Sequence, residues 1–315
     1  MIQLKTIAYG VASMLSVSLA YAAVDDVRVF GKAALAARTS TVQKTPAEAS
    51  PVILPALSVD QIVERNIAAR GGLAAWQRVQ SISFVGKIDA GKTRKDGGSI
   101  VTMNSPQGRA AARAELRAAL ANKGETPANK TIQLPFRMEL KRPLMTRLEI
   151  PFQGETAVQV YDGVQGWKLR PYLGRHEVEP FTPEELKAAA LQQELDGPLI
   201  NYAAKGTLVT LDGNERVDGH SSYRLKLILK TGDVRRIWID AQSFLDIRSE
   251  GAPRQWDGKL RPVMTYFRDF KSVDGLKIPH VLETTIEGVR GSENIIVEQV
   301  ALNSVSDNSR FKKPL

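Results

Sequence analysis

The sequence predicts a mainly β fold (α+β), an incomplete antiparallel β-barrel of about 10–11 strands with a few helices as its lid. The first observation is that hydrophobic side chains recur at every second residue, which is the period of a half-buried β-strand. The second is that short turn sequences join these stretches, and short connections favour antiparallel neighbours. Since a flat sheet of this size would expose its edges, we expect the strands to curl.

The clearest strands lie within residues 217–248. Hydrophobic and basic residues alternate along the first strand, and the turn at 231–233 leads into a second strand at 234–240. A third strand follows at 244–249, which completes an antiparallel meander. We expect its basic face to meet water or an acidic partner. The hydrophobic face is predicted to carry Tyr223, Leu225, Leu227, Ile237 and Ile239.

Two groups of helices interrupt the strands. The first begins at a capping-box pair, Ser58 and Gln61, and ends near residue 79. The second begins at another capping box, Thr182 and Glu185, and consists of a helix to about residue 195 and a short helical piece to residue 204. These helices cannot be crossovers between parallel strands. We therefore expect them to cover the open mouth of the curved sheet.

Strands account for most of the remaining chain. The segment after residue 171, with His176 and Glu179, lacks hydrophobic alternation and is interpreted as an exposed charged turn, with a metal site as the alternative. Further strands are predicted at residues 81–89, 132–141, 144–152, 157–161, 167–170, 208–211, 263–270, 278–287 and 293–302.

Composition and the N-terminus limit the class of protein. The chain has 315 residues, of which 43% are hydrophobic, and it has no cysteine, so disulfides and a lipid-modified cysteine are excluded. Residues 1–22 are interpreted as a secretory signal peptide cleaved after about Ala22. An anchor helix is the alternative, but its hydrophobic run is short for a membrane span. Residues 23–56 are predicted to be a flexible linker, and residues 57–315 a single domain.

A basic helical insertion at about residues 90–130 interrupts this domain. Residues 87–130 include nine basic and four acidic side chains, and this excess contributes more than half of the formal net charge of +9. Arg109, Arg113 and Arg117 recur every four residues and would share a helix face. Two interpretations stay open, a solvated excursion or a basic arm that contacts an anionic membrane surface or an envelope protein. Export argues against nucleic acid as a partner.

The sequence shows no convincing set of catalytic or metal-ligating residues. Its three histidines, His176, His220 and His280, are far apart in the chain, and no phosphate-binding, dinucleotide or nucleophile-elbow motif occurs in a usable context. His280 falls on the hydrophobic face of its predicted strand, where a hydrogen-bonded core histidine is favoured over a catalytic base. We therefore predict a protein that is not an enzyme and uses no cofactor and no metal.

Several short motifs, most of them turns and core strands, match one known family. They are VDG at 217–219, WID at 238–240, YDGVQGW at 161–167, DGPLINY at 196–202 and VDG at 273–275. On these motifs the chain resembles the periplasmic outer-membrane lipoprotein-sorting family, relatives of the LolA/LolB-like lipoprotein carriers. The resemblance covers roughly residues 57–314, apart from the basic insertion. It implies a LolA-like half-barrel around a hydrophobic cavity that holds acyl chains and hands a lipidated cargo between membranes.

Strand alternation assigns the residues that would line such a cavity. The alternative is that the same side chains form a filled, closed core, which alternation does not distinguish from a hollow one. The predicted lining residues are Leu148, Ile150, Val158, Val160, Tyr223, Leu225, Leu227, Ile237, Ile239, Met264 and Tyr266.

Three functions are compatible with these features. The first is a soluble periplasmic carrier whose partner is a lipid or an acylated lipoprotein. The second is a non-catalytic envelope scaffold that uses the same fold to bind another protein, with the basic insertion as its contact. The third is an enzyme, for which His280 would be the base.

Overall fold

The computed structural model describes residues 54–92, 131–171, 175–190, 195–256, 258–305 and 307–314. The predicted signal peptide, nearly all of the linker, and the basic arm with Arg109, Arg113 and Arg117 lie outside these residues. Within the described ranges, no helix is long and hydrophobic enough to cross a membrane.

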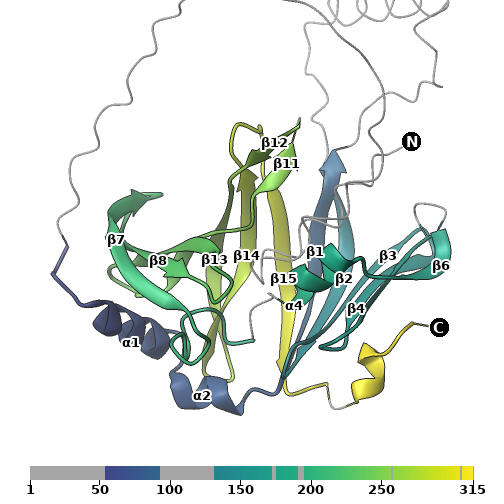
Figure 1. Cartoon of the computed structure of the whole chain (residues 1–315), viewed down its shortest axis with the longest axis horizontal. Helices are drawn as coiled ribbons and strands as arrows, with labels where there is room; N and C mark the ends of the chain where they lie inside the picture. Colours follow the sequence, from purple (N-terminus) through teal and green to yellow (C-terminus); the bar gives the residue numbers. More distant parts are fainter. Residues whose placement is uncertain are drawn as a thin grey trace, which may run out of the picture.

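One antiparallel sheet of thirteen strands dominates the described part of the chain (Figure 1). A separate ribbon pairs β11 (Arg254–Trp256) with β12 (Lys259–Arg261). The order of strands in the main sheet is β6 (Arg175–Pro180), β5 (Gly166–Arg170), β4 (Glu155–Tyr161), β3 (Met145–Phe152), β2 (Thr131–Lys141), β1 (Ser81–Lys92), β15 (Glu293–Leu302), β14 (Leu276–Ile286), β13 (Val263–Val273), β10 (Asp246–Glu250), β9 (Val234–Asp240), β8 (His220–Ile228) and β7 (Leu208–Val217). Its edge strands β6 and β7 do not pair with each other, which confirms the incomplete antiparallel barrel.

The order of the strands determines where the central connection of the chain must run. β1 pairs with β2 on one side and with β15 on the other, so the first and last strands meet in the middle of the sheet. The chain leaves the sheet at the β6 edge and re-enters it at the opposite edge as β7 (Figure 1). Residues 181–207, which we call the connector, therefore cross from one edge of the sheet to the other.

The sheet contains more strands than the hydrophobic pattern predicted. Residues 175–180, expected as a charged turn, form the edge strand β6, which pairs with β5 through Trp167 and Pro180 and through Lys168 and Glu179. Its side chains are exposed or half-buried, so it carries no hydrophobic alternation. The ribbon β11–β12 is similarly exposed. A hydrophobic period of two residues reveals only strands that have a buried face, and β6, β11 and β12 have no such face.

The helices form where capping residues predicted them. α1 (Val59–Ala69) and α2 (Leu73–Arg78) lie at the base of the strands, and α4 (Pro183–Ala190) packs against β5 (Figure 1). Ser58 and Gln61 exchange both hydrogen bonds of the capping box, and Thr182 and Glu185 do the same. Gly71 ends α1 with a φ of 114°, and an added Cβ would lie 2.6 Å from the Gly275 carbonyl oxygen.

The connector beyond α4 differs from the expected helix. Residues 195–206 form a series of turns, with positive φ angles at Gly197, Asn201 and Gly206. Each positive φ ends any helical run, because the αL conformation reverses the chain direction. Residues 191–194 lie outside the described ranges.

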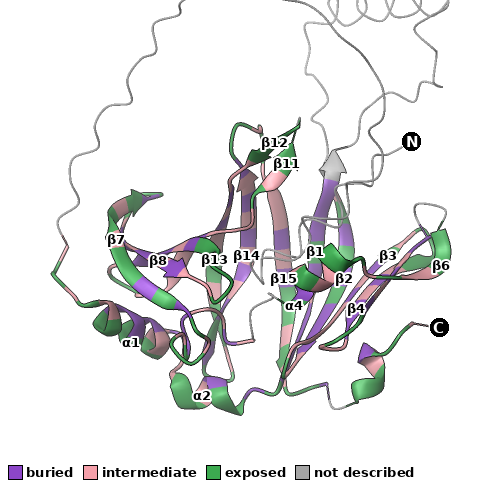
Figure 2. Cartoon of the chain, in the orientation of Figure 1, coloured by how far each residue is buried: buried purple, intermediate pink, exposed green. Residues whose placement is uncertain are grey.

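The ladder partners divide the sheet into an inner and an outer face. The inner face carries a central cluster from β1, β2, β3, β14 and β15, which includes Phe84, Phe136 and Leu282. It also carries a lateral cluster, in which β7, β8 and β9 pack against α1 through side chains such as Leu225 and Ile239. The outer face carries a smaller cluster beside the C-terminal 3₁₀-helix η4 (Asn308–Phe311). Buried residues follow the strands, whereas the solvent side of α1, most of α2 apart from its buried Trp76, and β6 are exposed or half-buried (Figure 2).

Candidate functional site

The inner face is the candidate functional site, because it gathers most of the predicted lining residues. They divide between the two inner clusters, and none is more than 7% exposed. Leu148 and Ile150 belong to the central cluster. The meander residues, which form the floor of the lateral cluster, are Tyr223, Leu225, Leu227, Ile237 and Ile239.

Val158 and Val160 lie on the outer face, not beside Leu148 and Ile150. In the ladder between β3 and β4, Val158 pairs with Glu149 and Val160 pairs with Arg147. Both valines pack with Val305 and Phe311 of the C-terminal segment. Alternation separates the two faces of a strand but does not say which face is the inner one. The C-terminal segment buries the outer face here, so the more hydrophobic face of β4 is the outer one.

Met264 and Tyr266 are also on the outer face, which corrects the same assignment for β13. Tyr266 pairs with Arg248 of β10 and with Glu283 of β14. The guanidinium groups of Arg248 and Arg268 lie 5.9 and 5.4 Å from the centre of its ring. The inner residues of this strand are instead Val263, Thr265 and Phe267. Tyr266 therefore contributes to an outer network of charges and rings, not to the hydrophobic wall.

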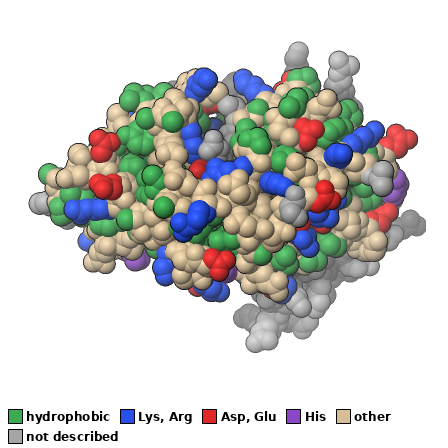
Figure 3. All heavy atoms as spheres, turned by 90° about the horizontal axis from the view of Figure 1, so that it is seen from below, with side chains coloured by type: hydrophobic (Ala, Val, Ile, Leu, Met, Phe, Trp, Pro, Cys, Tyr) green, Lys and Arg blue, Asp and Glu red, His purple; other side chains and the backbone are tan. Residues whose placement is uncertain are grey.

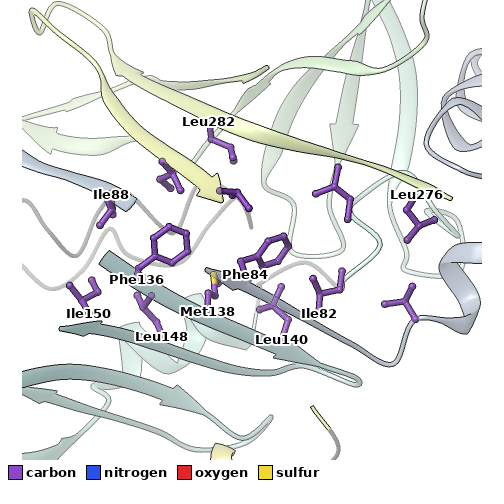
Figure 4. Close-up of a cluster of buried hydrophobic side chains, with 14 of the residues drawn as sticks. Ile82, Phe84, Ile88, Phe136, Met138, Leu140, Leu148, Ile150, Leu276 and Leu282 are labelled. Atoms are coloured by element: carbon purple, nitrogen blue, oxygen red, sulfur yellow. The ribbon is translucent and has the colours of Figure 1, made fainter. Parts of the chain in front are cut away.

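The central cluster forms a hydrophobic wall that the predicted residue set largely omitted. Its side chains from β1, β2 and β3 face those of β14 (Figure 4). The signal was present in the sequence, since hydrophobic residues alternate along residues 82–90 and 132–140. The members labelled in the figure are Ile82, Phe84, Ile88, Phe136, Met138, Leu140, Leu148, Ile150, Leu276 and Leu282.

The connector joins the two inner clusters. Leu199 packs into the lateral cluster and its neighbour Ile200 packs into the central cluster, and they are 1% and 0% exposed. Asp196 accepts hydrogen bonds from Arg142 at 3.0 Å and from Lys205 at 2.9 Å. The contact with Arg142 fixes the connector to the end of β2, and the contact with Lys205 lies within the connector itself.

α1 covers the lateral cluster and is held to the meander by polar contacts. Its buried Asn66 donates hydrogen bonds to the carbonyl oxygen of Phe244 at 2.8 Å and to Asp246 at 3.1 Å. Tyr202 of the connector donates a hydrogen bond of 2.8 Å to Asp60 of α1, and this bond raises the pKa of the Tyr202 hydroxyl. Burial raises the pKa of Tyr223, whose hydroxyl bonds the chain just before α1. Connector and helix are thus linked to each other as well as to the sheet.

Polar groups on the inner face are mostly hydrogen-bonded within the protein. His280 is 5% exposed and its Nδ1 lies 3.0 Å from the carbonyl oxygen of Ile278. The hydroxyl oxygens of Thr265 and Thr284 are 3.2 Å apart. Buried Lys168 of β5 donates to Glu185 of α4 at 2.6 Å. His280 is therefore a buried, hydrogen-bonded histidine, as the hydrophobic pattern of its strand favoured.

The outer face of the meander carries a network of arginines and carboxylates. Arg248 lies 3.8 Å over the ring of Trp238 and donates a hydrogen bond of 2.8 Å to Glu215. Burial raises the pKa of Glu215, but the hydrogen bonds from Trp238 and Arg248 outweigh it, and the pKa lies below its ordinary value. The hydrogen bond from Arg236 lowers the pKa of Asp212. The predicted basic face is therefore neutralised by carboxylates of the same chain.

The described residues contain no group of three or more His, Cys, Asp or Glu side chains that could hold a metal ion. His176 and His220 each contact one carboxylate, Glu155 at 3.3 Å and Asp240 at 3.0 Å. Both histidines are more than half exposed, so these contacts are surface pairs.

Seen from the side of α1 and α2, Lys and Arg side chains gather in the middle of the surface (Figure 3).

Comparison with known proteins gives likenesses of fold. No family model matches the sequence, and no curated protein matches it. Among solved structures, the chain is similar to a LolA superfamily protein from Nitrosomonas europaea, with 14% identity and a TM-score of 0.48 over 82% of this chain and 99% of that one. A domain described as an outer membrane lipoprotein-sorting protein, from Vibrio parahaemolyticus, has 12% identity and a TM-score of 0.45 over 80% and 95%.

A DUF1329 family protein from Desulfovibrio piger is similar to the same degree, with 13% identity and a TM-score of 0.48 over 82% of this chain and 98% of that one. Two of these three structures, the LolA superfamily protein and the lipoprotein-sorting domain, carry the name of the group that the sequence motifs of this chain resemble.

Proposed function

We propose that this protein is a periplasmic carrier that binds lipid or lipoprotein acyl chains against the inner face of its half-open sheet, in the sorting of outer-membrane lipoproteins. One observation carries the proposal. Among the described residues, the hydrophobic wall built by β1, β2, β3, β14 and β15 is covered by short helices and by the connector, not by a second sheet. A cover built from turns can move away from a wall at lower cost than a strand that shares a ladder with it.

The position of Leu199 and Ile200 suggests how an acyl chain would enter. Their side chains occupy the space between the central and lateral clusters, where the methylene groups of a chain would lie. Transfer of an acyl chain from water is worth about 0.8 kcal/mol for each buried methylene group, so a chain of ~16 carbons is worth on the order of ten kcal/mol. That energy exceeds the cost of exposing two aliphatic side chains, about 3–6 kcal/mol together. An acyl chain can thus replace them.

Export and partners belong to the same proposal. Residues 1–22 would direct the chain to the periplasm, and the partner would be a lipid or an acylated lipoprotein. The basic arm with Arg109, Arg113 and Arg117 would approach an anionic membrane surface or an envelope protein during transfer. The role requires no catalytic residue, cofactor or metal.

Photocrosslinking tests where the acyl chain binds. A fatty acid with a photoreactive diazirine in its chain is mixed with the protein and irradiated, and the adducts are mapped by mass spectrometry. We expect adducts at inner residues such as Phe84, Phe136 and Leu282. The outer residues Val158 and Val160 serve as internal controls. Adducts confined to the outer face, or protein from periplasm that carries no lipid by native mass spectrometry and takes up no fatty acid, would refute the carrier.

A matched pair of variants tests the displacement of the connector. Ile200→Ala and Val160→Ala each truncate a side chain that is 0% exposed, one in the connector and one on the outer face. Both should lower stability, since each opens a cavity. Only Ile200→Ala should change the affinity or rate of fatty-acid uptake, as measured by fluorescence. Equal effects on uptake would show that the connector does not gate the inner face.

The alternative is a non-catalytic envelope scaffold that binds another protein. It is favoured by the close burial of the predicted lining residues, of which all but Met264 and Tyr266 are at most 7% exposed. Deletion of residues 107–123 distinguishes the two functions. A carrier would still take up fatty acid without this segment, whereas a scaffold would lose its partner in a pull-down while its stability stays unchanged.

A further inference from the structure

Arg235 is a buried cation on the inner face, and no carboxylate among the described residues forms an ion pair with it. It is 8% exposed and lies opposite Leu227 in the ladder between β8 and β9, on the same face as Ile237. Its Nη1 donates a hydrogen bond of 3.0 Å to the carbonyl oxygen of Val234, and its buried Nε has no hydrogen-bond partner. None of the ion pairs among the described residues includes it.

The other arginines of the meander differ from Arg235 because each has a carboxylate partner. Arg224 and Arg236, on the outer face of the same two strands, bond Asp212 at 3.1 and 3.0 Å. Arg248 bonds Glu215 at 2.8 Å. All three are neutralised within the protein. Arg224 and Arg236 are clearly more exposed than Arg235, and Arg248 is comparable to it in exposure. A guanidinium group that is buried and lacks an anion is unfavourable, because it has lost water without gaining a counter-charge.

The surroundings of Arg235 combine hydroxyl groups with a hydrophobic surface. Ser249 pairs with Ile237, the next inner residue of β9, and Thr265 pairs with Ser249 across β10 and β13. Both are buried on the inner face, 6% and 2% exposed. Below them lie the side chains of the lateral cluster. An anionic group at Arg235 would thus lie beside hydrophobic side chains of the lateral cluster, on the face of the sheet that also carries these two hydroxyl groups.

We propose that Arg235 binds the anionic headgroup, a carboxylate or a phosphate, of an amphiphile whose acyl chain lies along the inner face. This inference rests on the proposed function and narrows its substrate class from acyl chains in general to anionic amphiphiles. The planar guanidinium presents its N–H donors in a geometry that matches both anions. The headgroup would supply the counter-charge that the described residues do not.

Headgroup selectivity of the full chain is the first test. Binding of hexadecanoate, hexadecyl phosphate and methyl hexadecanoate is measured by displacement of a fluorescent fatty acid. Because a hydrogen bond to a charged group is worth enough to change Kd by about tenfold or more, both anions should bind at least tenfold more tightly than the neutral ester. Acetate and inorganic phosphate, which have no chain, should not displace the probe or raise the Tm.

Three variants then assign the selectivity to this residue. Arg235→Met should remove the preference for anions by weakening their binding about tenfold while leaving the ester unchanged. Arg235→Lys should keep part of the preference. Lys226→Met removes a cation from the outer face of the adjacent strand and should bind like the wild type. If Arg235→Met does not fold, the role of Arg235 is tested by the headgroup selectivity of the wild type and of Arg235→Lys.

The failures of the two proposals can be told apart. Equal binding of ester and anions by the wild type would overturn the role of Arg235 and leave the acyl carrier standing. Binding of none of the amphiphiles would overturn both. Acetate or inorganic phosphate alone could also displace the probe or raise the Tm as much as the amphiphiles do. That result would show that Arg235 binds free anions and is not a headgroup site. Selectivity that persists in Arg235→Met would also refute this assignment.

Discussion

The two faces of the β8–β9 hairpin are covered by different interactions, the inner face almost completely and the outer face only in part. On the inner face, Leu225 is 0% exposed and packs among the hydrophobic residues of the lateral cluster under α1. On the outer face, Trp238 is 3% exposed because Arg248 stacks on its ring, and both donate hydrogen bonds to Glu215. The inner face excludes water through hydrophobic contact, and the outer face does so through paired charges and a ring.

Protection from water and hydrophobicity are therefore separate properties of a sheet face. A face of alternating arginines meets water in many proteins, but here Asp212 and Glu215 of β7 neutralise the arginines of β8 and β9. Hydrophobic burial is hardly affected by salt or pH, whereas ion pairs respond to both. Four predictions use this contrast.

The largest effect is expected from Leu225→Ala on the inner face. The variant should lose about 2–5 kcal/mol of the free energy of unfolding, because it removes a fully buried side chain and leaves a cavity. Urea unfolding followed by tryptophan fluorescence measures the change. Lys226→Ala, at the next position on the opposite face, should change it by about 0.5 kcal/mol or less. Similar losses in the two variants would contradict the assignment of faces.

A smaller effect is expected from Glu215→Gln on the outer face. The amide cannot accept charge-assisted bonds from Arg224 and Arg248 as the carboxylate does. Because Glu215 is about one-third exposed, the loss should be only about 1 kcal/mol. The same urea titration measures it. A loss as large as that of Leu225→Ala would mean that the outer network, not the hydrophobic cluster, holds the hairpin together.

The pH dependence of stability should come from the outer face. The pKa values of Glu215 and Asp212 lie below their ordinary values of 4.5 and 3.8 in the folded protein. Their contribution is therefore fully present above the ordinary values and is lost as the pH falls through the lowered ones. We expect the Tm to fall on acidification below about pH 4.5, and less steeply in Glu215→Gln. If the Tm of the wild type and of Glu215→Gln fell in parallel with pH, Glu215 would be excluded as a source of the pH dependence of stability.

The smallest effect should be that of salt on the outer network. Raising the ionic strength from about 0.05 to 1 M shortens the Debye length to about 3 Å, so partly exposed ion pairs are screened. The stability difference between the wild type and Glu215→Gln should shrink by a few tenths of a kcal/mol. The difference for Leu225→Ala should stay constant. If the loss of unfolding free energy in Leu225→Ala also depended on salt, the assignment of hydrophobic contact to the inner face and ion pairs to the outer face would be wrong.

The inner side of the meander could be predicted from the sequence because one face is hydrophobic and the other is basic. Tyr223, Leu225 and Ile239 lie in one buried cluster as alternation indicated. The same reasoning misplaced Val160 and Tyr266, since their strands carry substantial side chains on both faces. For such strands the period shows that two faces exist, and only the neighbouring strands decide which one is inner.

The hydrophobic period, the turn residues and the capping boxes determined an open antiparallel sheet with helices at its margins, because these are local properties of the chain. Tertiary structure alone decided that β6 and β7 are opposite edges, so that the connector must cross the inner face. It also decided that Arg235 forms no ion pair with any described carboxylate, while Arg224 and Arg236 share Asp212. Partners of this kind come from distant strands, and no local pattern in the sequence records which strands become neighbours.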